Sequence, residues 1–251
     1  MRLRNFPHVG RGAAIVPNQV FYLRSDIHLC LADGHCVFMD LEHDTYCCLS
    51  KDDTHALLTY LGYTSSDTAR RTQTPPPRPT AIIRALRQRN FLAMTSTDGK
   101  ALAKALAPLS NEGLQQYVTN SVDRLRLAHV LRFFHATALA SLQLKTYSMR
   151  RTVAMIKRSK ERSGNVVTSA TECARLFAVF QRLRPYYPRP YLCLFDSLAL
   201  VHFLSRFGLF PDWVFGVKVA PFGAHCWVQI NDVLVNDIPD NVTSYSPIMR
   251  I

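Results

Sequence analysis

Three short apolar runs lie between residues 28 and 50, where the sequence reads HLCLADGHCVFMDLEHDTYCCLS. Turn-forming residues separate the runs, first at Asp33-Gly34 and then at residues 42–44. β-favouring runs divided in this way predict a meander of three strands. Residues 51–61 have helical periodicity, with Ser50 placed as the N-cap and two aspartates in the first turn, where negative charge suits the helix dipole. We therefore expect a helix directly after the last strand.

The next segment, residues 62–80, is rich in Ser, Thr and Pro and contains three consecutive prolines, which predicts an exposed, partly extended loop. Thr80 can cap a helix over residues 81–89, and the apolar residues 91–94 predict a short strand. These elements complete a small domain of strands and helices. We assign residues 1–97 to this domain and residues 98–251 to a second one.

Helical periodicity returns between residues 101 and 147, with Leu125, Leu131 and Phe134 as candidate core positions of a long helix. Residues 157–166 are polar and predict a loop. Ser169 and Glu172 then have the spacing of a capping box, so a second long helix should begin there and end before Pro185.

The final third of the chain contains a cysteine placed at a predicted helix N-terminus. After Cys193 the apolar residues Leu194, Leu198, Val201 and Leu204 recur at helical spacing, and Gly208 follows as a candidate C-terminal cap. Unpaired backbone N–H groups and the helix dipole favour a thiolate at this position and can hold an oxyanion. A small buried residue that opens a core helix is the alternative interpretation.

Three predicted strands follow this helix, over residues 213–219, 225–230 and 233–237. His225 begins the second strand and Asp237 ends the third, so a hairpin would bring both to one edge. Each residue alone would more often be structural. Together with Cys193 they supply a nucleophile, a base and a carboxylate that orients the imidazole.

Strand parity sets a condition on this triad. A strict two-residue turn at Asn231-Asp232 would place His225 opposite Ile238 and direct Asp237 to the other face. The triad therefore predicts an odd-length turn or a bulge in this hairpin.

Composition narrows the class of protein. The 251 residues are 48% hydrophobic and 19% charged, which predicts a folded chain. The first residues have no apolar stretch typical of a signal peptide, and no run approaches the roughly 18 apolar residues of a membrane span, so we expect a soluble cytoplasmic protein. Seven cysteines indicate reduced thiols, and their spacing does not match that of zinc ligands. The net charge of +12 suits nucleic acid, an anionic membrane surface or an acidic partner, without choosing among them.

The motifs around the triad resemble a known family. Cys193 with LFDSLAL, Ala224-His225-Cys226-Trp227-Val228 and Val235-Asn236-Asp237 resemble the leader peptidase of lasso peptide biosynthesis, the B protein, which is a transglutaminase-like cysteine peptidase. Residues 28–60 resemble the PqqD-like element that binds the leader peptides of ribosomally made peptides. Cys226 departs from the pattern, and its thiol could form a disulfide with Cys193 on oxidation.

The resemblance implies an α+β chain, in which an N-terminal winged-helix-like, PqqD-type domain precedes a transglutaminase-like, papain-type cysteine peptidase domain. It implies that the first domain binds the leader as an added strand and that the second cleaves leader from core without a metal or cofactor. An asparagine-synthetase-like, ATP-dependent cyclase would receive the core, and nucleic acid and membranes would not be partners. The implied leader-binding residues are Val37, Phe38, Asp40, Tyr46, Cys47, Leu49, Arg84 and Arg87.

Two other functions stay open. The same triad could transfer an acyl group to an amine, as transglutaminases do, because only the acceptor differs from hydrolysis. A non-catalytic winged-helix protein that binds nucleic acid could use the arginines of residues 81–89, which are Arg84, Arg87 and Arg89. This second function leaves the Cys, His and Asp arrangement unexplained.

Overall fold

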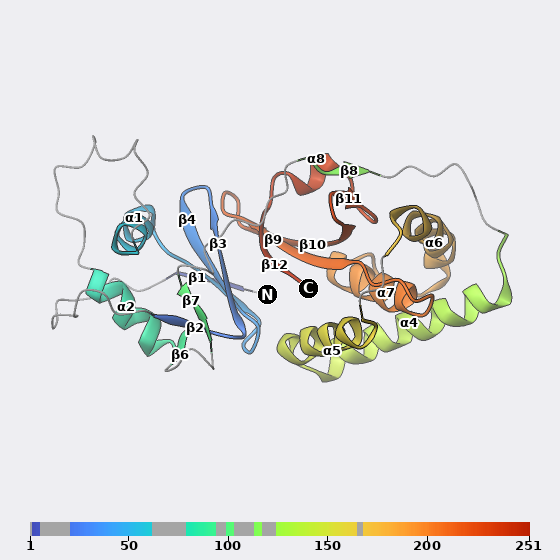
Figure 1. Ribbon diagram of the computed structural model, residues 1–251, viewed down its shortest axis with the longest axis horizontal. Helices are drawn as coiled ribbons and strands as arrows, with labels where there is room; N and C mark the ends of the chain where they lie inside the picture. Colours follow the sequence, from blue (N-terminus) through green and yellow to red (C-terminus); the bar gives the residue numbers. More distant parts are fainter. Residues whose placement is uncertain are drawn as a thin grey trace. The chain divides into compact units, whose positions relative to one another are not determined.

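The computed structural model describes residues 2–5, 21–61, 79–93, 99–102, 113–116, 124–164 and 168–251 (Figure 1). The chain divides into two compact units, residues 1–108 and residues 109–251. The predicted loop over residues 62–80 lies outside the described residues up to residue 78. The first unit extends past residue 97, because a strand over residues 99–101 pairs within it.

The first unit contains two small sheets. Its strands are β1 (Arg2–Asn5), β2 (Tyr22–Arg24), β3 (Ile27–Ala32), β4 (His35–Asp40), β5 (Thr45–Cys48), β6 (Leu92–Ala93) and β7 (Gly99–Ala101). One sheet has the order β1-β5-β4-β3 and the other β6-β2-β7. The predicted meander is confirmed as β3, β4 and β5, with Asp33 and Gly34 both at positive φ in the first turn. The short strand predicted within residues 91–94 is confirmed as β6.

Two helices complete the first unit, α1 (Lys51–Tyr60) and α2 (Pro79–Gln88). Ser50 caps α1 as predicted, because its side chain accepts a hydrogen bond from the Asp53 N–H. The helix α2 begins at Pro79, one residue before the predicted cap. Apolar side chains of both helices and of the meander form one core, which includes Phe38, Leu57 and Ile83.

The second unit combines helices with a five-stranded sheet. Its helices are α4 (Leu127–Thr146), α5 (Met149–Arg162), α6 (Ala170–Leu183), the 3-10 turn η1 (Arg184–Tyr186), α7 (Cys193–Ser205) and α8 (Pro239–Val242). Its strands are β8 (Gln115–Gln116), β9 (Asp212–Lys218), β10 (Gly223–Ile230), β11 (Val233–Leu234) and β12 (Ser246–Arg250), in the order β12-β9-β10-β11-β8.

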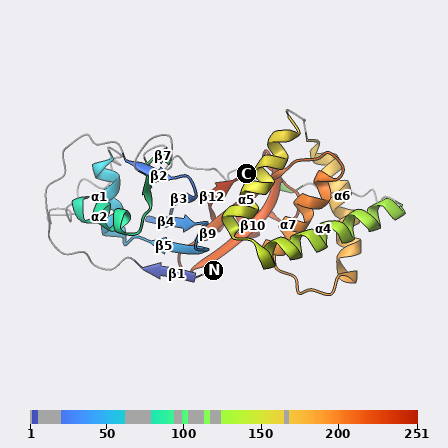
Figure 2. The same ribbon diagram turned by 90° about the horizontal axis from the view of Figure 1, so that it is seen from below.

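The helix α7 is the centre of the second unit. It packs against α4 and α6 as well as the strands β9 and β10, and Figure 2 shows it between α4 and the sheet. The predicted end of this helix is confirmed, since Gly208 has a φ of 75° and the Leu209 N–H bonds back to the Leu204 carbonyl. Ser169 caps α6 as predicted, and the helix ends before Pro185.

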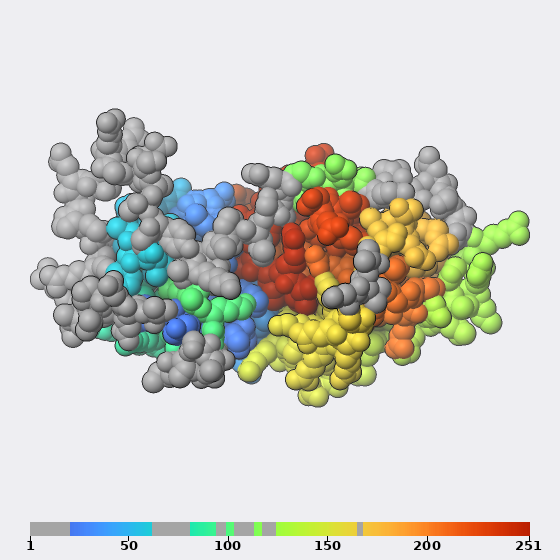
Figure 3. Space-filling view, in the orientation of Figure 1, coloured from blue at the N-terminus to red at the C-terminus, as the bar shows by residue number. Residues whose placement is uncertain are grey.

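Two predictions about the helices are wrong. Residues 157–162, predicted as loop, belong to α5, because Ser148 caps this helix and Met149, Thr152 and Ile156 supply a buried stripe. The surface of α5 is yellow in Figure 3. The candidate core positions Leu131 and Phe134 on α4 and Leu125 just before it are all exposed, and the buried face of α4 contains Phe133, Ala136 and Ala140 instead. No helix among the described residues has the length and apolarity needed to cross a membrane.

Candidate active site

Cys193 is the first residue of α7 and is exposed to solvent. The side chain of Asp196, one turn further on, accepts the N–H of the N-cap residue Leu192 at 2.8 Å. Helical N–H groups of the first turn have no partner within the helix, so their partial positive charge faces the cysteine. The predicted position of Cys193 at a helix N-terminus is confirmed.

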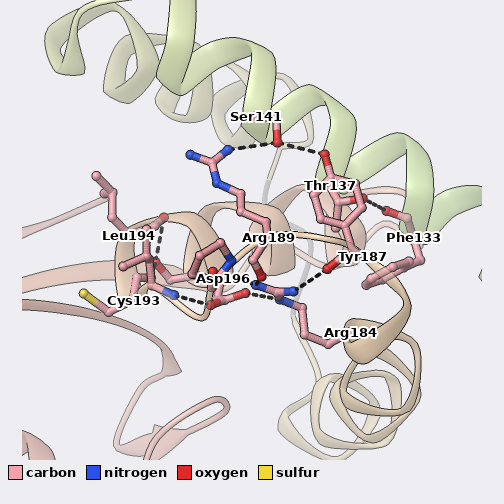
Figure 4. A network of polar contacts seen from close by, with 12 residues as sticks. Phe133, Thr137, Ser141, Arg184, Tyr187, Arg189, Cys193, Leu194 and Asp196 are labelled. Atoms are coloured by element: carbon pink, nitrogen blue, oxygen red, sulfur yellow. Dashed lines mark hydrogen bonds and ion pairs between the residues drawn. The ribbon is translucent and has the colours of Figure 1, made fainter.

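A buried arginine fixes the segment that leads into α7 (Figure 4). Arg184 is only 3% exposed and forms an ion pair with Asp196. It also donates to the backbone carbonyls of Tyr187 at 3.2 Å, and of Arg189 and Pro190 at 3.0 Å each. One guanidinium therefore connects η1, the following loop and the first turn of α7. The position of Cys193 depends on this network.

His225 and Asp237 meet from neighbouring segments of the chain. His225 lies on β10, and its Nε2–H donates to Asp237 Oδ2 at 2.5 Å. The other carboxylate oxygen accepts from the Ile238 N–H at 2.9 Å and from Asn241 Nδ2 at 3.1 Å. Because Nε2 is engaged by Asp237, Nδ1 is the ring nitrogen that remains for Cys193. The structure thus brings the three predicted residues together.

The predicted odd-length turn or bulge in this hairpin is wrong. The turn at Asn231-Asp232 has two residues, with Ile230 opposite Val233, so the expected odd-length turn is not there. The ladder instead changes at Asn236, whose Oδ1 accepts the Val228 N–H at 2.6 Å in place of a backbone carbonyl. The paired strand stops at Leu234, and the chain is then free to direct Asp237 toward His225.

Electrostatics favour an ion pair between the cysteine and the histidine. Hydrogen bonds with the Cys226 thiol and the His225 ring lower the pKa of Cys193 from 9.0 to about 4. Hydrogen bonds with Asp237 and with Cys193 raise the pKa of His225 from 6.5 to about 9. Burial opposes the ionisation of Asp237, but bonds from His225, the Ile238 N–H and Asn241 outweigh it and lower the pKa of this carboxyl. Between about pH 4 and about pH 9 the site therefore contains the Cys193 thiolate and the His225 imidazolium.

Comparison with known protein families adds an independent result. Residues 136–250 match the family described as the Transglutaminase-like superfamily. These residues are a transglutaminase-like domain. The match includes all three candidate catalytic residues, and the superfamily comprises cysteine peptidases and acyltransferases. Neither the curated proteins nor the solved structures compared with the chain give a match.

A second thiol lies beside the candidate nucleophile of the transglutaminase-like domain. Cys226 Sγ is buried and lies 3.3 Å from Ser197 Oγ, which also donates to the Cys193 carbonyl at 2.6 Å. Trp213 Nε1 in turn donates to Ser197 Oγ at 2.8 Å. Burial raises the pKa of Cys226 well above 9.0, so it stays a thiol and can donate its S–H to the Cys193 thiolate.

A cavity of about 340 Å³ in this domain is lined by Cys193, the candidate nucleophile. The candidate triad and Cys226 form one side of it. The remaining lining residues come from α6, α7 and the segments before α7 and after β11; they are Phe177, Phe180, Gln181, Arg184, Tyr191, Asp196, Leu200 and Asn236. A substrate that enters this cavity would place its reacting atom next to Cys193.

The residues implied in leader binding lie in the first unit. Val37, Phe38, Tyr46, Cys47 and Leu49 are core side chains, each 2% exposed or less.

Charged members of the same set differ in exposure. Asp40 is buried and forms ion pairs with Arg24 and His43. Arg84 is half-buried and Arg87 is exposed, with its guanidinium 5.5 Å from the centre of the Phe21 ring. Of the implied residues, the two arginines of α2 are therefore the ones whose side chains are open to a partner.

Several residues that position the site were missed by sequence reasoning. Arg184, Asp196 and Ser197 act through contacts between elements, which periodicity does not report. Asn236 stood in a quoted motif, but its role depends on a side chain that replaces a backbone acceptor. Among the described residues, no group of three or more His, Cys, Asp or Glu side chains is arranged to hold a metal ion.

Proposed function

We propose that the transglutaminase-like domain is a cysteine peptidase that cleaves a peptide precursor with Cys193 as nucleophile, His225 as general acid and base, and Asp237 as the residue that orients the imidazole. The observation that carries this proposal is the His225 Nε2–Asp237 Oδ2 hydrogen bond of 2.5 Å, made at a cavity that Cys193 also lines. The ion-paired thiolate supports it, because the thiolate is the attacking form of cysteine.

The reaction follows from this geometry. The Cys193 thiolate attacks the carbonyl carbon, and the oxyanion forms next to the N–H groups of the first turn of α7. The imidazolium of His225 then protonates the leaving amine, so the C–N bond breaks and an acyl-enzyme remains. Water, deprotonated by the neutral His225, attacks the thioester and restores the thiolate.

The finer proposal is that the substrate is a lasso peptide precursor and that the first unit binds its leader. The meander supports it, because an extended peptide can add to the edge of such a sheet. In this chain the β5 edge already pairs with β1, which is a parallel added strand, and β3 ends the other side of the sheet. The leader would then contact the sheet through its backbone and the arginines of α2 through its acidic side chains. An asparagine-synthetase-like cyclase would receive the core.

Acyl transfer is the second candidate function, and the Transglutaminase-like superfamily match favours it. The first half of the reaction is shared, and only the acceptor of the acyl group differs. After hydrolysis, the summed mass of the two fragments equals the mass of the precursor plus one water. After transfer, the acyl fragment has the added mass of the acceptor amine. The mass of the products therefore decides between the two.

The test is mass spectrometry of the precursor peptide after incubation with the wild type or Cys193→Ala, in reducing buffer with an added primary amine. Each sample is run with and without the cyclase. We expect a single cut by the wild type and none by Cys193→Ala. Leader binding, followed by fluorescence anisotropy, should be equal for both proteins.

Cleavage by Cys193→Ala near the wild-type rate would remove Cys193 as the nucleophile. Binding of leader without any cut would leave a recognition protein without peptidase activity.

A further inference from the structure

One wall of the active-site cavity is apolar. Phe177 and Phe180 on α6, Leu200 on α7 and Tyr191 in the preceding segment line it together with the triad. Phe180 and Leu200 are buried beneath the surface, while Phe177 is half-buried and within reach of an entering group. This wall can remove an apolar side chain from water.

The charged side chains of the cavity are already paired. Each of the three nitrogens of Arg184 donates to an oxygen of Asp196 or of the η1–α7 segment. The Arg184 guanidinium also lies 4.3 Å from the centre of the Tyr191 ring. Asp196 accepts from Arg184 and from the Leu192 N–H. A charged substrate side chain would therefore lose its hydration in this cavity without gaining a partner from this pair.

Exposed apolar residues also flank two of the candidate catalytic residues in the sequence. Tyr191 is 68% exposed and Leu192 is 53% exposed, and they are the two residues before Cys193. Ile238, directly after Asp237, is 39% exposed. Tyr191 also lines the cavity, so an apolar group of a substrate held at Cys193 can contact its ring.

We propose that this cavity is a specificity subsite that takes a large aliphatic or aromatic side chain on the acyl side of the reacting bond. The proposal rests on Cys193 as the nucleophile of the proposed function. We assign the subsite to the acyl side because the acyl group stays bonded to Cys193 during both half-reactions. The volume of about 340 Å³ lies at the small end of ligand clefts, roughly 300–1,000 Å³, which suits a side chain rather than a folded domain.

The experiment uses acetyl-dipeptide p-nitrophenyl esters as acyl donors for the full chain. One series varies the residue that carries the ester and the other varies the residue before it, each with Phe, Leu, Ala, Lys or Glu. The Cys193 thiolate forms a thioester, and the breaking C–O bond releases p-nitrophenolate, which is measured as kcat/KM. We expect Phe and Leu to exceed Ala, Lys and Glu by at least about tenfold in one series.

Two matched variants test the apolar wall. Phe177→Glu should lower kcat/KM for the Phe ester by about tenfold and raise it for the Lys ester. Phe134→Glu makes the same change at an exposed position of α4 outside the cavity and should leave the order of esters unchanged. If circular dichroism shows that Phe177→Glu fails to fold, Tyr191→Ser at the exposed rim should reduce the preference for Phe over Ala.

Equal rates for all esters in both series, or an unchanged preference in a folded Phe177→Glu and in Tyr191→Ser, would overturn the subsite and leave Cys193 as the nucleophile. No Cys193-dependent release of p-nitrophenolate from any ester would overturn the proposed function together with the subsite.

Discussion

At the scale of single residues, the ionisation of Cys193 depends on a thiol as well as on the histidine. Cys226 stands first among the groups that lower the pKa of Cys193, and Ser197 and Trp213 hold it in place from the buried side. An S–H group that donates a hydrogen bond stabilises the Cys193 thiolate. Removal of this donor removes that stabilisation. Cys226 is therefore a positioning residue for the nucleophile.

This role predicts the effect of Cys226→Ala on pH dependence. In the wild type, iodoacetamide should alkylate Cys193 with a rate that rises through about pH 4 rather than about pH 9, because the folded pKa is lowered. In Cys226→Ala this rise should move toward neutral pH, while Cys226→Ser, which keeps a donor, should restore most of the shift. The measurement is the alkylation rate from pH 3.5 to 9, followed by mass spectrometry. A curve that does not move in Cys226→Ala would contradict the role.

The triad residues were predictable because each has a distinctive chemistry at a position that the local pattern fixes. Cys193 follows from the start of an apolar periodicity, and His225 from the start of a strand. The hydrogen bond from the Val228 N–H to the Asn236 side chain was not predictable, because counting strand parity assumes that backbone groups make every hydrogen bond of the ladder. The Asn236 side chain accepts one of these hydrogen bonds, so the assumption does not hold here.

At the scale of elements, the N-terminus of α7 is held by a buried ion pair. Arg184 donates from three nitrogens to oxygens in four residues, a set that the single ammonium of lysine cannot reproduce. The segment before Cys193 is also anchored by the Tyr187 hydroxyl, 2.9 Å from Ser141 Oγ, and by Arg189, whose Nη1 donates to the same oxygen at 2.9 Å.

Arg184→Lys should therefore lower the free energy of unfolding by about 3 kcal/mol, since it leaves buried carbonyls and Asp196 poorly partnered. It should also slow the reaction of Cys193, because the first turn of α7 loses its fixed position. Urea denaturation and alkylation rates measure the two effects. Arg182→Lys, at an exposed position of the preceding helix α6, is the control, and equal losses in both variants would refute the prediction.

A glycine on β9 limits the space around the histidine. A Cβ at Gly216 would lie 2.8 Å from the Trp227 ring and 3.0 Å from Tyr245 Cβ, and both side chains pack against His225. Gly216→Ala should cost roughly 1–3 kcal/mol of stability and reduce activity by moving the imidazole.

The matched change on β10 is Gly223→Ala. There a Cβ would meet the flexible end of Lys218 at 2.9 Å, which can move aside. Thermal unfolding and ester turnover compare the two variants. Full activity in Gly216→Ala would show that Trp227 and Tyr245 do not position His225.

Element types were easier to predict than the faces they bury. The strands and helix caps follow from local residues such as Ser50, Ser169 and Gly208. The buried face of α4 could not be predicted in this way. Several of its exposed residues are large and apolar, whereas the small residues Ala136 and Ala140 are buried where α4 packs closely against α7. A sequence records the size of each side chain but not the neighbour that it must fit.

At the scale of the whole molecule, the proposed function assigns recognition to the first unit and chemistry to the second. The division at residues 108 and 109 leaves β8 with the sheet of the second unit. A fragment of residues 109–251 should therefore keep the wild-type alkylation rate of Cys193 and the turnover of the short esters.

The same fragment should cleave the full precursor much more slowly, because binding by the first unit raises the local substrate concentration. Adding a free leader peptide should slow the full chain and leave the fragment unaffected. If the fragment and the full chain cleaved the precursor at equal rates, the first unit would not contribute to substrate recognition.

The resting charge state of the nucleophile has a consequence for control. The thiolate and the imidazolium form without a substrate, because groups of the protein itself lower the pKa of Cys193 and raise the pKa of His225. A cysteine that is reactive before substrate binds depends on its surroundings for selectivity. Selectivity must then arise from what is admitted and how long it stays, and small electrophiles or peroxides that reach the cysteine would inactivate the protein without resembling any substrate.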